Sequence, residues 1–172
     1  MASRAERTQV HILLALLITA CGCGASRHST GESAHRSDAE QYRNLSQLRQ
    51  DVIREAKRWL GTPYRYRGTD AAGMDCSGLV STAFARTGIS LPRTARDMYK
   101  RGKSTSVRER IPGDLVFFRN TAGKGITHVG IYLGGYSFIH SSTTRGVIVS
   151  SLNDQYYRAH YAGARDVLGE AQ

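Results

Sequence analysis

The sequence predicts an α+β fold, with helices in the first half of the folded part and an antiparallel β-sheet in the second. Apolar residues recur at three- and four-residue steps in residues 44–60, and a second helical pattern occupies residues 75–88. After a turn signal at residues 111–114, short β-branched and aromatic segments alternate with glycine, serine and asparagine. The 172 residues, 40% of them hydrophobic, suffice for one compact domain.

Residues 1–20 have the pattern of an export signal. Arg4 and Arg7 precede an apolar run at residues 12–18, which is too short to span a bilayer comfortably but suits a secretion signal. The run ends in Ile18-Thr19-Ala20-Cys21, which resembles the bacterial lipoprotein processing box. That resemblance implies that Cys21 takes diacylglycerol and becomes the new amino terminus. An ordinary signal, or a short anchor with an incidental cysteine, is the alternative.

We therefore expect an exported protein that acyl chains anchor to the cell envelope, without a membrane-spanning helix. Gly22, directly after Cys21, is not the aspartate that is associated with inner-membrane retention. The resemblance thus favours the outer membrane, facing the periplasm, if the cell has one.

The net charge narrows the choice of partners. Lys and Arg number 24 against 14 Asp and Glu, which gives a formal charge of +10 and favours contact with nucleic acid, anionic lipid headgroups or an acidic cell-wall polymer. No basic block is interleaved with stacking aromatics and no zinc-finger spacing is present, so we expect no nucleic-acid partner.

Residues 21–43 are expected to form the lipidated cysteine and a flexible linker, because they contain almost nothing to bury. Cys23 lies in this stretch, so we do not expect it to pair with Cys76, although export would permit a disulfide. Cys76 is then a free thiol in an oxidising compartment. The folded domain is expected at residues 44–172.

The elements follow in order along the chain. The first helix is expected to begin near Asn44 as N-cap and to end at Gly61. The second begins at about Asp75 and ends at Gly88, and a short helix through Met98 follows. Five strands are then expected, at residues 115–118, 129–133, 138–140, 147–150 and 161–167.

Cys76 falls in the first turn of the second helix, where free backbone N–H groups and the helix dipole stabilise a thiolate. His128, at the start of a strand, is the candidate base, and a cysteine facing a histidine in this way gives a thiolate–imidazolium pair. His140 is the candidate for the third residue that orients the imidazole. Taken singly, Cys76 could instead be an inert core residue, and each histidine a structural one. A zinc site from these three residues is a further alternative, although no acidic fourth ligand is evident.

The hairpin between the two histidines provides a geometric test, because side chains alternate between the faces of a strand. A two-residue loop at residues 134–135 would point His140 away from His128. A three-residue loop at residues 134–136 would place His140 opposite Gly130, diagonal to His128 on the same face. The proposed pairing therefore requires an odd loop or a bulge.

Four motifs in order resemble those of the NlpC family of papain-like cell-wall peptidases, over about residues 51–167. They are residues 75–80 (Asp-Cys-Ser-Gly-Leu-Val), 112–118 (Pro-Gly-Asp-Leu-Val-Phe-Phe), 128–133 (His-Val-Gly-Ile-Tyr-Leu) and 138–142 (Phe-Ile-His-Ser-Ser). The resemblance implies a nucleophilic Cys76, a general base His128 and an orienting His140. It also implies that the Tyr64 hydroxyl and the Cys76 backbone N–H hold the oxyanion, although Tyr64 could instead simply pack beside Tyr66.

The resemblance implies a peptidoglycan endopeptidase that cuts stem or cross-link peptides, and the pattern before Cys21 adds a lipid anchor. We expect no cofactor or metal, and a monomer. We also expect Asp75, Ser77 and Arg93 near the substrate groove, with a plain surface role for Arg93 as the alternative. Two other functions stay open. One is a non-catalytic wall-binding lipoprotein, and the other is an amidase or acyltransferase with the same nucleophile.

Overall fold

The computed structural model describes residues 30–169, with side chains described from Glu40 onward. The predicted signal peptide, Cys21 and Cys23 lie outside the described residues. The helices are α1 (Thr30–Lys57), α2 (Cys76–Ala85), α3 (Ala95–Met98) and α4 (Gln155–His160). The strands are β1 (Thr69–Asp70), β2 (Gly73–Met74), β3 (Lys103–Thr105), β4 (Leu115–Arg119), β5 (Ile126–Gly134), β6 (Ser137–Ser142), β7 (Gly146–Ser151) and β8 (Tyr161–Asp166).

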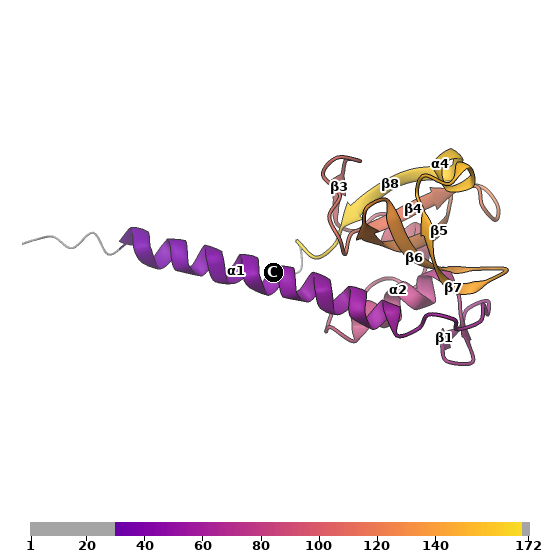
Figure 1. Ribbon diagram of the computed structural model, residues 1–172, viewed down its shortest axis with the longest axis horizontal. Coiled ribbons are helices and arrows are strands. Elements are labelled where there is room, and N and C mark those ends of the chain that lie inside the picture. The colour runs from indigo at the N-terminus through magenta and orange to yellow at the C-terminus, as the bar shows by residue number, and fades with distance from the viewer. Residues whose placement is uncertain (1–29, 170–172) are drawn as a thin grey trace, which may run out of the picture.

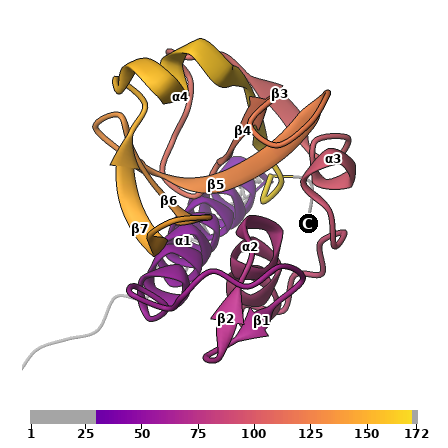
Figure 2. The same cartoon turned by 90° about the vertical axis from the view of Figure 1, so that its right-hand side faces the viewer.

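Six strands form one antiparallel sheet in the order β3-β8-β4-β5-β6-β7, while β1 and β2 form a small separate hairpin. The sheet is covered on both faces, with α1 and α2 on one and α4 on the other (Figures 1 and 2). The side chains of β4 show that both faces of the sheet are buried. Leu115 and Phe117 are buried with the helices, whereas Val116 and Phe118 are buried with Tyr157 of α4. The predicted α+β fold is confirmed.

The first helix is longer than predicted. It begins at Thr30 and not near Asn44, so the linker expected to be flexible is helical from Thr30 onward. The prediction relied on buried apolar positions, but residues 30–43 contain good helix formers such as Ala, Glu, Gln and Arg, and extending a nucleated helix needs no burial. Figure 1 shows this part of α1 projecting away from the rest of the fold. Within residues 30–169, no helix has the length and apolar character needed to cross a membrane.

The hairpin of β5 and β6 contains the predicted irregularity, in the form of a bulge. Ile131 pairs with Ile139, but the register shifts before Gly134, which pairs with Ser137. The connection is therefore a two-residue loop, and both of its residues have positive φ, Gly135 at 54° and Tyr136 at 63°. The extra bulged residue, Leu133, restores the parity that a three-residue loop would give.

A buried ion pair joins α1 to the sheet. Arg49 Nη1 lies 2.8 Å from Asp114 Oδ1, and Arg49 Nη2 lies 2.7 Å from Asp166 Oδ1. The other oxygen of Asp114 accepts from the backbone N–H of Ile111 at 3.2 Å. Asp114 is fully buried. The Pro-Gly-Asp motif that reads as a turn thus also anchors the first helix.

Candidate active site

Cys76 is the first residue of α2, and the residue before it caps that helix. Asp75 has extended backbone (φ −87°, ψ 176°), and its Oδ1 accepts from the backbone N–H of Gly78 at 2.7 Å. The thiol is free, and the residue is 9% exposed. The predicted position of Cys76 in the first turn of the second helix is what the structure has.

Asp75, Ser77 and Arg93 form one network beside Cys76. The Arg93 guanidinium binds Asp75 through both carboxylate oxygens, at 2.9 Å each, and also donates to Ser77 Oγ at 2.9 Å. Asp75 Oδ2 accepts as well from the backbone N–H of Arg67 at 2.9 Å. The structure therefore brings the three expected groove residues together, and they satisfy one another. In the structure they hold the start of α2, where Cys76 lies.

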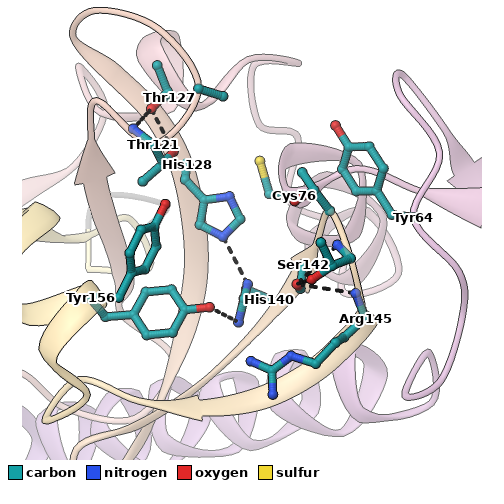
Figure 3. A pocket seen from close by; sticks show the side chains of 13 residues that line it. Tyr64, Cys76, Thr121, Thr127, His128, His140, Ser142, Arg145 and Tyr156 are labelled. Carbon is teal, nitrogen blue, oxygen red and sulfur yellow. Dashed lines mark hydrogen bonds between the residues drawn. The ribbon is translucent and has the colours of Figure 1, made fainter.

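His128 and His140 face each other across the β5–β6 hairpin, with 2.9 Å between His128 Nε2 and His140 Nδ1 (Figure 3). In Figure 3 the other ring nitrogen of His128 is turned toward Cys76. Gly130 makes room for this arrangement, because a Cβ there would lie 3.2 Å from His140 Cβ and 2.7 Å from Phe138 Cδ2. The structure thus unites the three residues expected to be catalytic.

His140 has further partners that the sequence does not reveal. Its Nε2 lies 3.0 Å from Ser150 Oγ on β7 and 3.1 Å from the Tyr157 hydroxyl on α4. The Phe138 ring stacks on the imidazole at 4.8 Å between centroids. No local motif marks Ser150 or Tyr157, because their contact with His140 arises from the β6–β7 register and from the packing of α4.

The hydrogen bonds of the two imidazoles constrain which ring nitrogens can carry hydrogen. If His128 is to accept a proton on the nitrogen turned toward Cys76, its Nε2 must carry the hydrogen and donate to His140 Nδ1. His140 must then carry its own hydrogen on Nε2, where the hydroxyls of Ser150 and Tyr157 can accept it. All the groups in this chain can thus be satisfied while His128 has a free lone pair for the thiol.

Burial dominates the electrostatics of the site. It raises the pKa of the Cys76 thiol to about 11, although the backbone N–H of Val129 acts in the opposite direction. Burial also lowers the pKa of His128 to about 4 and that of His140 to about 3, the latter helped by His128 and by the charge of Arg145. Without substrate the site therefore favours a neutral thiol and neutral imidazoles. The predicted stabilisation of a thiolate by the helix start is outweighed.

A family model described as the NlpC/P60 family matches residues 61–166, which include Cys76, His128, His140 and the strands that carry the two histidines. The chain belongs to the NlpC/P60 family. This membership confirms the expected kinship with NlpC-type cell-wall cysteine peptidases, and so the expectation of an enzyme of that class.

Individual members of the NlpC/P60 family resemble the chain closely. The Escherichia coli K12 protein named Murein DD-endopeptidase MepS/Murein LD-carboxypeptidase is 34% identical over 177 residues, which cover 93% of this chain and 91% of that protein. The Probable endopeptidase NlpC of the same strain is 43% identical over 110 residues, or 63% of this chain and 71% of the relative. A solved NlpC/P60 family protein from Bacillus cereus has a TM-score of 0.66 and 38% identity, and covers 70% of this chain and 40% of its own.

Tyr64 of this NlpC/P60 domain lines the same hollows as Cys76. An isolated bridge pairs Tyr64 with Met74, two residues before Cys76, and Ser141 Oγ donates to the Met74 carbonyl at 2.7 Å. In Figure 3, Tyr64 and His128 lie on opposite sides of Cys76. This position suits the oxyanion role that the sequence suggests for Tyr64.

Two hollows meet at Cys76, and Tyr64 lines both. The smaller, about 320 Å³, is bounded by the two histidines, the β6–β7 turn and α4. The larger, about 750 Å³, lies toward α3 and contains the Asp75–Arg93 pair. An extended peptide could therefore cross the sulfur with contacts on each side. Within the described part of the chain, no group of three or more His, Cys, Asp or Glu side chains is placed to hold a metal ion.

Proposed function

We propose that this protein is a lipid-anchored peptidoglycan endopeptidase that hydrolyses stem or cross-link peptide bonds with Cys76, His128 and His140. The single observation that carries the proposal is the shared cleft, in which the thiol and the hydrogen-bonded histidine pair line the same 320 Å³ hollow. The names of its relatives, among them a murein DD-endopeptidase, support peptidoglycan as the substrate.

The geometry supports a two-step acyl transfer. The Cys76 proton passes to His128 as the sulfur attacks the scissile carbonyl carbon, and the carbonyl oxygen becomes an oxyanion. The Cys76 backbone N–H and the Tyr64 hydroxyl donate to that oxygen. His128 then returns the proton to the leaving amine, which departs and leaves a thioester on Cys76. In the second step His128 takes a proton from water, hydroxide attacks the thioester, and the thiol is regenerated with release of the new carboxylate.

His140 acts through His128 and not on the substrate. By accepting from His128 Nε2 it holds the ring with the other nitrogen toward the sulfur. Its own Nε2 is held by Ser150 and Tyr157. This arrangement keeps the imidazole oriented through both proton transfers.

The anchor is the second part of the proposal. The box that ends at Cys21 supports lipidation of that cysteine and attachment to the cell envelope, with the outer membrane favoured by Gly22. Intact mass of the envelope-bound protein should correspond to a chain beginning at Cys21 with acyl chains attached. A Cys21→Ser protein that remains envelope-bound with the same acyl mass would refute this part.

Incubation of the full chain with peptidoglycan fragments tests the enzymatic part. The unaltered protein should produce new amino and carboxyl termini, and Cys76→Ala should lower the rate at least ~10³-fold, because the nucleophile is gone. Equal products from both proteins would refute the assignment. Products joined to a new acceptor amine would indicate an acyltransferase, and binding without any product would indicate a wall-binding protein. The position of the new termini identifies the cleaved bond.

A further inference from the structure

The smaller hollow beside Cys76 has one formally charged side chain on its wall. Its lining, drawn in Figure 3, consists of hydroxyl-bearing, aromatic and small residues, the two histidines and Arg145. No aspartate or glutamate is among these lining residues. A peptide that enters this hollow therefore meets a positive charge that no acid on the same wall offsets.

The turn that carries Arg145 is held in place on two sides. It connects β6 to β7, and its Ser142 Oγ accepts from the Arg145 backbone N–H at 3.3 Å. Gly146 has φ 69°, and a Cβ added there would collide with the Thr62 carbonyl oxygen. The turn is thus seated against the loop before Tyr64. A charge on a fixed turn at the edge of a cleft can select a ligand without first being ordered.

The Arg145 side chain is exposed, and its guanidinium forms no ion pair or hydrogen bond with the other residues that the structure describes. Figure 3 shows its side chain extending below His140. Its charge is close enough to contribute to the low pKa of His140. Among residues 40–169, the ion pairs formed by arginine involve Arg49, Arg54, Arg58, Arg65 and Arg93 and not Arg145. Arg93, one of three arginines that line the larger hollow, is by contrast already bound to Asp75.

We infer that Arg145 is a recognition site for a carboxylate of the substrate peptide, so that peptidoglycan peptides with free carboxylates are preferred over amidated ones. This inference rests on the proposed function and specifies the substrate of the same site. A guanidinium binds a carboxylate through two parallel hydrogen bonds, which an amide cannot reproduce. A bound carboxylate would also offset the charge that acts on His140, so that recognition and the basicity of the histidine pair are linked.

Binding to an inactive protein tests the inference apart from catalysis. In a full chain with Cys76→Ala, calorimetry would compare a stem tetrapeptide that has free carboxylates with the same peptide after all carboxylates are amidated. The free acid should bind ~10-fold more tightly or better, and adding Arg145→Gln should remove most of that preference. The matched control is Arg158→Gln, which removes the same charge from an exposed side chain of α4 that lines neither hollow and should change the preference less than ~2-fold. Arg145→Lys should give an intermediate preference, because lysine keeps the positive charge but cannot form the two parallel hydrogen bonds of a guanidinium.

Equal affinity for the two peptides, or the same loss with Arg145→Gln as with Arg158→Gln, would overturn the inference. The comparison of the two peptides on the protein with an intact Arg145 needs no substitution in the turn. Equal affinities would therefore overturn the inference even if a variant is unstable. Hydrolysis by the unaltered enzyme reports separately on the proposed function. Cleavage of both peptides at equal kcat/KM would support the proposed peptidase activity and contradict the role of Arg145. A binding preference for the free acid without any cleavage would support the carboxylate site and contradict the proposed peptidase activity.

Discussion

His140, which contacts His128, adds no negative charge beside Cys76 and His128. Burial favours a protonated thiol and an unprotonated His128. An ion pair at contact distance gains about 4 kcal/mol at a dielectric of about 20, or roughly three powers of ten in the equilibrium. That gain is smaller than the opposing preferences of the two groups. A carboxylate in the third position would add to it, but the third position holds a neutral histidine.

The pH dependence of thiol alkylation should show this neutral resting state. Because the pKa of Cys76 is raised to about 11, its reaction rate with iodoacetamide should rise about tenfold per pH unit from pH 7 to about pH 10. Free cysteine, measured in parallel, should level off above pH 8.5. A plateau of rapid Cys76 alkylation between pH 5 and pH 7 would show a preformed thiolate–imidazolium pair and contradict the prediction.

At the residue scale, the sequence indicates the candidate catalytic residues better than the residues that position them. Cys76, His128 and His140 stand in ordered local motifs and are brought together as expected. Ser150 and Tyr157 are not marked by any motif, because their contacts with His140 depend on pairing and packing between distant segments. The same holds for the pKa of Cys76, which is governed by burial that a helix position does not reveal.

At the scale of elements, the attachment of α1 to the sheet depends on the Arg49–Asp114 pair. Arg49→Met should lower the free energy of unfolding by about 3 kcal/mol, because it leaves the fully buried Asp114 carboxylate without its charge partner. Burial already raises the pKa of Asp114, which is the direction expected of a carboxylate that is costly to bury. Denaturant unfolding followed by circular dichroism measures the change.

Arg54→Met is the control for this experiment. Arg54 pairs with Asp51 on the same helix, but its side chain is 57% exposed. The loss of that solvent-exposed pair should change stability far less than the loss of the buried one. Equal effects of the two substitutions would show that the Arg49–Asp114 pair does not anchor α1.

Element boundaries were predictable where burial sets them and not elsewhere. The five expected strands are present as β4 to β8, because each has a face in the core. The bulge at Leu133 was predictable only as a requirement, since it follows from the need to place both histidines on one face. The start of α1, the hairpin of β1 and β2, the strand β3 and the helix α4 were missed, because none of these segments carries a repeated apolar pattern.

At the scale of the whole molecule, the half-buried His128 and the buried His140 make the protein sensitive to acid. Their pKa values in the folded protein are about 4 for His128 and about 3 for His140, against 6.5 for a free side chain. The unfolded chain therefore binds more protons below pH 6.5. Stability is fully present above that pH and is lost as the pH falls toward 4 and 3, by on the order of 3 kcal/mol from His128 alone.

Thermal unfolding between pH 7.5 and pH 4 measures this loss. The Tm should be nearly constant from pH 7.5 to 6.5 and then fall steadily with acid. His128→Gln should show a shallower fall, because a group that must stay unprotonated in the folded state has been removed. If the slope of the variant matches that of the unaltered protein, the acid sensitivity has another source.

In the stretch of α1 that extends beyond the core, the number of residues sets both the length of the helix and the direction in which its first residue faces (Figure 1). Each helical residue adds about 1.5 Å along the helix axis and turns the chain by about 100° around that axis. Deleting two residues from this stretch would shorten it by only about 3 Å yet send the preceding chain out on the opposite azimuth, whereas deleting seven would nearly restore the original heading. The direction in which the chain leaves the helix should thus change periodically with the number of residues inserted or deleted, and not in proportion to that number.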